Sequence, residues 1–71
     1  MPVVVDNREM SGVLKLRREP FDPWVLVEFP DGSSEDIEGI LLVDFLTKIG
    51  LKEPEHCADV VWNQYKVDIR V

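Results

Sequence analysis

The chain has little cysteine and no long hydrophobic run, and both absences restrict what it can be. Its single cysteine, Cys57, cannot form an intrachain disulfide, whereas a secreted domain of this size would usually depend on several. The first apolar run, residues 2–5, stops at Asp6. It is too short for a signal-peptide core or for the roughly 20 apolar residues of a membrane helix. We therefore expect a cytoplasmic protein with no membrane partner.

Motifs that would identify an enzyme or a cofactor site are also missing. The four glycines do not form a phosphate-binding loop, and there is neither a Ser-His-Asp motif nor a pair of cysteines. Only His56 and Cys57 bring a base and a nucleophile close together along the chain. Adjacent side chains do not face each other on a helix or a strand. We therefore expect no catalytic activity and no cofactor.

The same segment holds the densest set of potential metal ligands. On a helix, Glu55 and Asp59 would share a face, and so would His56 and Asp59, which is the spacing that metal-binding pairs use. The set has no second histidine or cysteine, without which a structural zinc site is hard to build. A small metal-binding protein or enzyme that uses His56 and Cys57 is therefore kept as an alternative function, with no metal ligand assigned.

What the chain does contain is the composition of a folded domain. Its 71 residues are 45% hydrophobic and 31% charged, which suits one hydrophobic core, so residues 1–71 are interpreted as a single domain. The formal net charge of −6 repels nucleic acid. The one basic cluster, Lys15, Arg17 and Arg18, has no interleaved aromatic residue for base stacking. Nucleic acid is therefore not expected as a partner.

Alternating apolar and polar residues predict an antiparallel sheet. Leu14 and Leu16, for example, would lie on one face of a strand, and Lys15 and Arg17 on the other. Residues 24–29 contain a single charged residue, which favours a central strand with both faces largely covered. A polar turn is expected at residues 6–9. The expected strands are residues 3–5, 12–18, 24–29, 65–71 and, as an edge strand in preference to a helix entry, 33–38.

One helix is clearly indicated at residues 40–49. Gly50 can adopt the left-handed conformation of a Schellman motif, Leu51 can supply its hydrophobic contact, and Pro54 prevents continuation of the helix. The apolar residues follow the i, i+3, i+4, i+7 spacing of a helical face. They are Leu42, Phe45, Leu46 and Ile49.

The segment between that helix and the last strand is ambiguous. Pro54 could open a short helix, whereas residues 60–62 suggest an extended segment and residues 63–64 a turn. The complete prediction is an α+β domain. It has a small twisted antiparallel sheet of about five strands, open or curled into a barrel, and one main α-helix at about 40–49 packed on it.

The aromatic residues divide into core and loop positions. Phe29, Phe45 and one of the two tryptophans are expected in the core, because a small domain needs the buried area of its large side chains. Phe21 lies between two prolines, in a loop where an exposed aromatic can anchor an interface. Packing back against Trp24 is the alternative that the general behaviour of loop aromatics favours.

Glu35, Asp36 and Glu38 form an acidic arm that either imitates a row of phosphates or protects a sheet edge. Because catalytic motifs are missing, the sequence favours a non-enzymatic module that binds another protein or a second copy of itself. An acidic inhibitor or nucleic-acid mimic is the first alternative. The candidate partner-binding residues are Phe21, Trp24, Glu35, Asp36 and Glu38.

Overall fold

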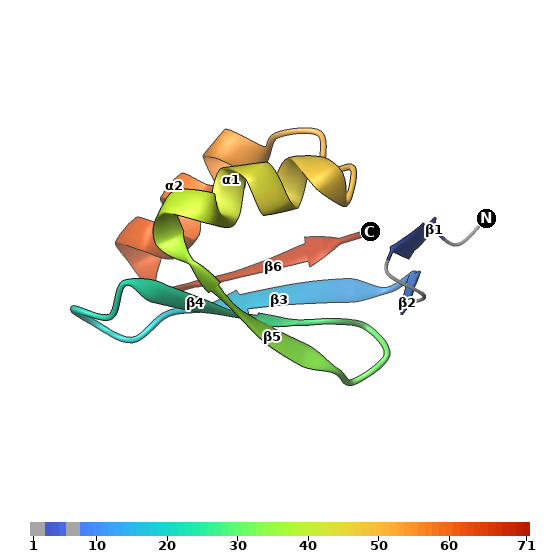
Figure 1. Ribbon diagram of the computed structural model, residues 1–71, viewed down its shortest axis with the longest axis horizontal. Coiled ribbons are helices and arrows are strands. Elements are labelled where there is room, and N and C mark those ends of the chain that lie inside the picture. Colours follow the sequence, from blue (N-terminus) through green and yellow to red (C-terminus); the bar gives the residue numbers. More distant parts are fainter. Residues whose placement is uncertain (1–2, 6–7) are drawn as a thin grey trace.

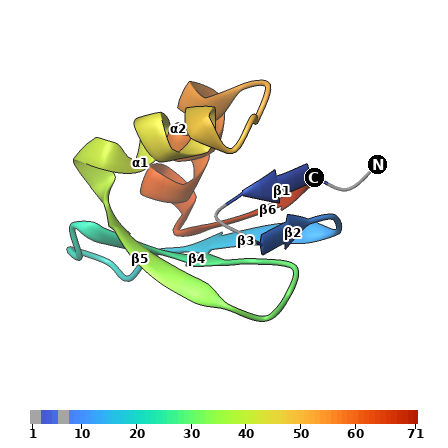
Figure 2. The ribbon, with the colours of Figure 1, turned by 45° about the vertical axis from the view of Figure 1, so that its right-hand side comes forward.

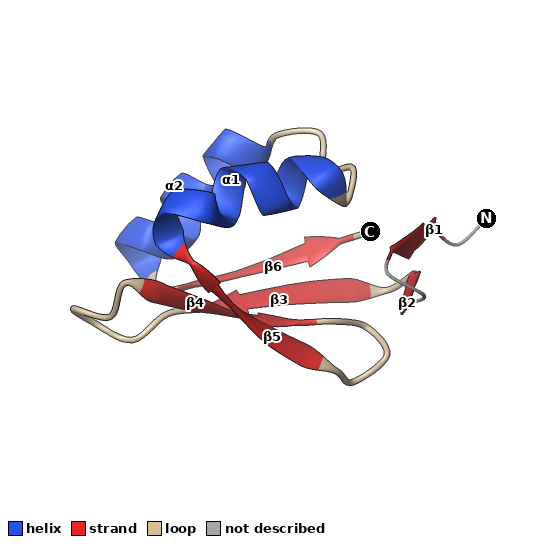
Figure 3. Cartoon of the chain, in the orientation of Figure 1, coloured by secondary structure: helices blue, strands red, loops and turns tan. Residues whose placement is uncertain are grey.

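The chain folds as an α+β domain in which two helices cover one face of an antiparallel sheet (Figures 1 and 3). The computed structural model describes the backbone of residues 3–5 and 8–71 and the side chains of residues 11–71. The elements of this part of the chain are β1 (Val3–Val5), β2 (Arg8–Met10), β3 (Val13–Arg17), β4 (Trp24–Glu28), β5 (Ser34–Glu38), α1 (Gly39–Lys48), α2 (Pro54–Gln64) and β6 (Lys66–Arg70).

The main sheet has the strand order β5-β4-β3-β6, and each neighbouring pair is antiparallel. It is open, with β5 and β6 at opposite edges (Figure 2). The predicted sheet of about five strands is therefore a four-stranded sheet and a separate β1-β2 pair, within the residues that the structure describes. The edge position expected for residues 33–38 is confirmed by β5.

Alternation along the strands gives the sheet two different faces. The covered face packs under the helices and includes Leu14, Leu16, Val25 and Val27, all fully buried. The open face consists of the alternate residues of the same strands. These are Val13, Lys15, Arg17, Trp24, Leu26, Glu28, Ser34, Asp36, Glu38, Lys66, Asp68 and Arg70.

The position of the central strand was predicted correctly, but the burial of its two faces was not. β4 lies between β3 and β5, as expected for residues 24–29. Its two faces are not both covered, because both helices lie on the same side of the sheet (Figure 3). Trp24 is 45% exposed and Leu26 is half-buried on the open face.

The start of the chain contains one predicted strand and one that was not predicted. β1 confirms the strand at residues 3–5, and β2 pairs with it antiparallel, Val5 opposite Arg8. The predicted turn at residues 6–9 is wrong for Arg8 and Glu9, and residues 6–7 lie outside the described residues. Backbone pairing in a short hairpin needs no apolar side chains, so the polar sequence concealed β2.

Helix α1 ends as the sequence predicts. The Gly50 N–H donates to the Thr47 carbonyl at 3.0 Å, and the Leu51 N–H donates to the Leu46 carbonyl at 3.2 Å. Gly50 has a φ of 90°, the left-handed conformation expected of it. These two hydrogen bonds form the Schellman motif and satisfy carbonyls at the helix end.

Helix α2 resolves the ambiguity at residues 54–62 in favour of a helix, and it replaces the turn expected at residues 63–64. Pro54 opens the helix at a position where its missing N–H has no helical partner, and Tyr65 ends it with a φ of 69°. Val61 is fully buried, and Cys57 and Ala58 pack beside the core from the same face of the helix. This packing outweighs the strand propensity of Val60 and Val61, which made the sequence prediction for this segment ambiguous.

The core lies between the covered face and the two helices. Phe29 and Phe45 join it as predicted, with ring centroids 6.1 Å apart at an angle of 68°. The expectation of a core tryptophan is wrong, because Trp24 and Trp62 are 45% and 41% exposed. In the described part of the chain, no helix has the length and apolarity needed to cross a membrane. The buried residues are Leu14, Leu16, Val25, Val27, Phe29, Leu42, Leu46, Ile49 and Val61.

Candidate functional site

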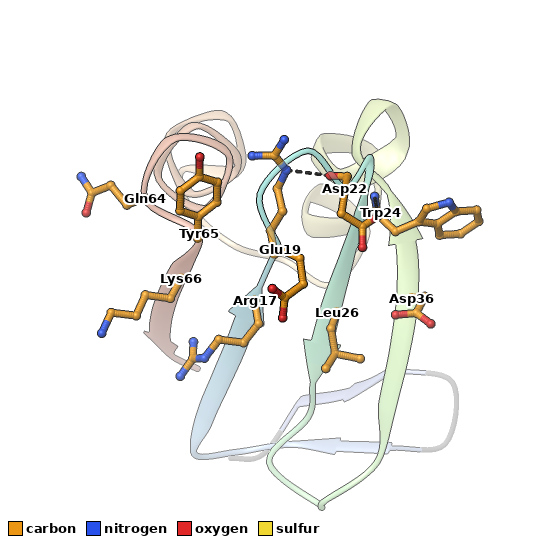
Figure 4. A pocket seen from close by; sticks show the side chains of 10 residues that line it. Arg17, Glu19, Asp22, Trp24, Leu26, Asp36, Gln64, Tyr65 and Lys66 are labelled. Atoms are coloured by element: carbon orange, nitrogen blue, oxygen red, sulfur yellow. Dashed lines mark hydrogen bonds between the residues drawn. The ribbon is translucent and has the colours of Figure 1, made fainter.

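The candidate site is the open face of the sheet, together with the loop that joins β3 to β4. Its central row crosses all four strands as Lys66, Arg17, Leu26 and Asp36, which are successive cross-strand neighbours (Figure 4). The row therefore runs from basic side chains on β6 and β3 to a carboxylate on β5. The next row has Asp68, Lys15, Glu28 and Ser34 on the same four strands.

Ion pairing within the molecule involves only part of this face. Arg17 forms an ion pair of 2.8 Å with Asp68 and donates a hydrogen bond of 2.9 Å to the Leu16 carbonyl. Among the described side chains, Lys66 and Asp36 form no ion pair, although both are exposed. Lys66 on β6 and Asp36 on β5, at the two edges of the face, are therefore available to a partner.

A shallow groove of about 400 Å³ lies where the open face meets the β3–β4 loop (Figure 4). Its lining combines apolar surface from Trp24, Leu26 and Tyr65 with charged groups of both signs. The groove therefore offers a ligand both apolar contact area and charged groups. The remaining lining residues are Arg17, Arg18, Glu19, Asp22, Asp36, Gln64 and Lys66.

Arg18 anchors one side of the loop. Its Nε donates to the Asp22 carbonyl at 2.9 Å, and a terminal guanidinium nitrogen donates to the Trp62 carbonyl at 2.7 Å. Its guanidinium carbon also lies 3.6 Å from the centroid of the Trp62 ring, in cation–π contact. On the other side, the Gly39 N–H donates to the Pro23 carbonyl at 2.8 Å. The loop is thus held in one position relative to both helices.

Phe21 occupies the tip of this loop in an unusual conformation. The Asp22 N–H donates to the Glu19 carbonyl at 3.1 Å, which closes a β-turn with Pro20 in its second position. Phe21 has a φ of 66° and its side chain is 100% exposed. In a type II turn this third position normally requires glycine. The alternative that Phe21 packs on Trp24 is therefore wrong.

The acidic arm does not form a single row of carboxylates. Asp36 and Glu38 lie on the open face beside Leu26 and Trp24 of β4. Glu35 is the cross-strand neighbour of Val27 and belongs to the covered side of β5. Alternation along a strand sends successive side chains to opposite faces, so only two of the three predicted acidic residues can contact one partner surface together.

The His56 and Cys57 region lies on α2, away from this site. His56 is exposed and Cys57 is half-buried. Burial, and secondly the nearby carboxylate of Glu53, raises the pKa of the Cys57 thiol above its ordinary value of 9.0. The thiol is thus held in its weakly nucleophilic protonated form. Within the described part of the chain, no group of three or more His, Cys, Asp or Glu residues is placed to hold a metal ion.

The structure thus gathers some of the predicted site residues and adds others. Trp24 and Asp36 line the groove, Glu38 lies beside Trp24, and Phe21 projects from the adjoining loop. Four residues of the groove were not expected from the sequence, because their convergence depends on the order of the strands: Arg17, Leu26, Tyr65 and Lys66. The alternation in residues 12–18 and 65–71 was the available signal, but it did not show that these strands are neighbours.

Comparison with known proteins identifies no relative. No protein-family model matches the chain, and neither the curated proteins nor the solved structures contain a significant match.

Proposed function

We propose that the chain is a non-enzymatic interaction module that binds protein through the open face and the β3–β4 loop. The observation that supports this most is Phe21, a fully exposed aromatic side chain in a left-handed backbone conformation. The proposed contact surface combines the exposed Phe21 ring on the β3–β4 loop with the adjoining groove, which Trp24 and Leu26 line among charged residues.

The conformation of Phe21 is unfavourable in the isolated molecule. The left-handed conformation costs an L-residue with a Cβ atom about 1–2 kcal/mol, and glycine adopts it without that penalty. Because the ring is fully exposed, it buries no apolar surface and does not contribute to the free energy of folding. A phenylalanine at this position is explained if the ring is buried against a partner.

The surroundings of Phe21 support the same function. Arg18 and Gly39 fix the loop on both sides, so the ring is presented on a backbone that is already ordered. Such ordering lowers the entropy lost on binding. Exposed aromatic anchors surrounded by charged groups are typical of protein interfaces.

The test is a capture experiment with a substitution that preserves the turn. Phe21→Gly relieves the backbone and removes the ring, so we expect unfolding stability to stay the same or to rise by up to about 1 kcal/mol. A partner captured from the native cell should be lost with Phe21→Gly and weakened with Trp24→Ala. Ile40→Ala is the matched control, because Ile40 is 86% exposed on α1, on the other layer. Equal retention by Phe21→Gly and the parent chain would contradict the proposal.

A further inference from the structure

The two edges of the open face carry opposite charges, and this division makes the face complementary to itself. On the open face, β5 carries Asp36 and Glu38 and is net negative, whereas β6 carries Lys66, Arg70 and Asp68 and is net positive, with Asp68 already paired to Arg17. Figure 4 shows the central row from Lys66 at one side to Asp36 at the other. We propose that the partner of this face is a second copy of the chain, stacked face to face. This inference rests on the proposed function and names the partner.

The charges select one orientation of the two copies. A two-fold axis parallel to the strands, between β3 and β4, places β6 of one copy over β5 of the other. Lys66 then lies opposite the second copy's Asp36, and Arg17 opposite its Leu26. In the adjacent row, Lys15 lies opposite the second copy's Glu28. Each of these ionic contacts occurs twice, because the two-fold axis repeats it.

The other symmetric arrangements bring like charges together. A two-fold axis in the plane of the interface that runs across the strands along the central row places β5 on β5 and β6 on β6, so Asp36 and Lys66 each oppose their own copy. Joining the sheets edge to edge through β5 has the same defect, because antiparallel pairing about Asp36 places that carboxylate beside its own copy, and pairing about Ile37 places Asp36 beside Glu38. Charged edges of this kind are a known protection against edge pairing. Face-to-face stacking avoids both conflicts.

The area of the open face indicates how strongly two copies of the chain can associate. Four strands spaced about 4.8 Å apart, with five residues of about 3.4 Å each, give a face of roughly 17 by 19 Å. The area of a face with these dimensions is less than the ~800 Å² that each partner contributes to a standard interface. We therefore expect a dimer that depends on protein concentration and has to be measured up to about 1 mM.

The test exchanges the charges of one predicted contact. Lys66→Asp and Asp36→Lys each place like charges opposite each other in a homodimer, so each should raise the dimer dissociation constant at least about tenfold. An equimolar mixture of the two variants restores both contacts and should form a heterodimer close to the parent affinity. Sedimentation equilibrium of the parent chain, each variant and the mixture measures this directly. Circular dichroism confirms that these exposed substitutions leave the fold intact.

Two features of the design separate local pairing from the effect of net charge. Asp36→Lys raises the formal net charge of −6 by two, so reduced repulsion alone would strengthen self-association, whereas the proposal predicts that it weakens. The controls are Asp44→Lys and Lys48→Asp on α1, which change the net charge equally at residues far from the open face. The controls should not reproduce the tenfold loss or the recovery on mixing.

The results also separate this inference from the proposed function. A parent chain that stays monomeric to about 1 mM, or a mixture that does not recover affinity, overturns the second copy as the partner. Capture of a different protein that depends on Phe21 would then still support an interaction module. If the chain neither associates with itself nor binds a protein through Phe21, both proposals fail.

Discussion

The covered and open faces of the sheet are built from alternate residues of the same strands, yet they hold different chemistry. Leu14 and Leu16 of β3 are fully buried under the helices, whereas on the opposite face Lys15 is exposed and Arg17 is half-buried. Apolar burial on the first face supplies most of the driving force for folding. The second face can therefore vary its charges with little effect on the fold. The comparison predicts that stability and binding can be changed separately.

The largest expected effect compares one leucine from the core with one from the open face. Leu46 on α1 is fully buried, and Leu46→Ala should lower the free energy of unfolding by about 2–5 kcal/mol through lost burial and a cavity. Leu26 is half-buried on the open face, so Leu26→Ala should cost clearly less. Denaturant midpoints of the two variants measure the difference. Equal losses would show that the open face contributes to the core.

The next prediction concerns how closely the helices pack against the end of the sheet at Gly39. A Cβ atom at Gly39 would lie 2.5 Å from a Trp62 ring carbon and 3.1 Å from the Pro23 carbonyl oxygen. Gly39→Ala should therefore destabilise the fold by about 1–3 kcal/mol, although the same change inside a helix ordinarily stabilises by up to ~1 kcal/mol.

The control for Gly39→Ala is the substitution Trp62→Leu, which replaces the ring by a smaller side chain. If the ring is the obstacle, Gly39→Ala should be less damaging in the Trp62→Leu background, which a double-mutant cycle measures. Additive effects would instead assign the strain to the Pro23 carbonyl oxygen, which the tryptophan substitution does not remove.

The predictable parts of this fold are those that neighbouring residues determine. The alternation in residues 12–18, the apolar spacing of residues 40–49 and the end of α1 at Gly50 all depend on short-range chemistry, and the structure confirms them. Residues 54–62 stayed ambiguous between helix and strand because residues 60–62 have strand propensity, and only contact with a core assembled from distant segments makes them helical.

The candidate site was harder to predict for the same reason. The Arg18 guanidinium reaches the Trp62 carbonyl across 44 positions of sequence, and no local pattern indicates that contact. Phe21 was identified from its flanking prolines, but its left-handed backbone and full exposure required the structure. The acidic arm was identified from composition alone, which does not show that Glu35 belongs to the other side of β5.

The smallest expected effect on stability is on the open face itself. Asp36 is exposed and forms no ion pair among the described residues, so Asp36→Asn should change the free energy of unfolding by no more than ~1 kcal/mol. The substitution also removes one negative charge from a chain of net charge −6, which slightly reduces self-repulsion. Binding should respond more strongly than folding, because a carboxylate opposite a basic group raises the association rate and makes it sensitive to salt. Chemical denaturation and association kinetics at two ionic strengths measure both properties of the same variant. A large loss of stability, or an association rate with the parent salt dependence, would show that Asp36 does not make the contact assigned to it.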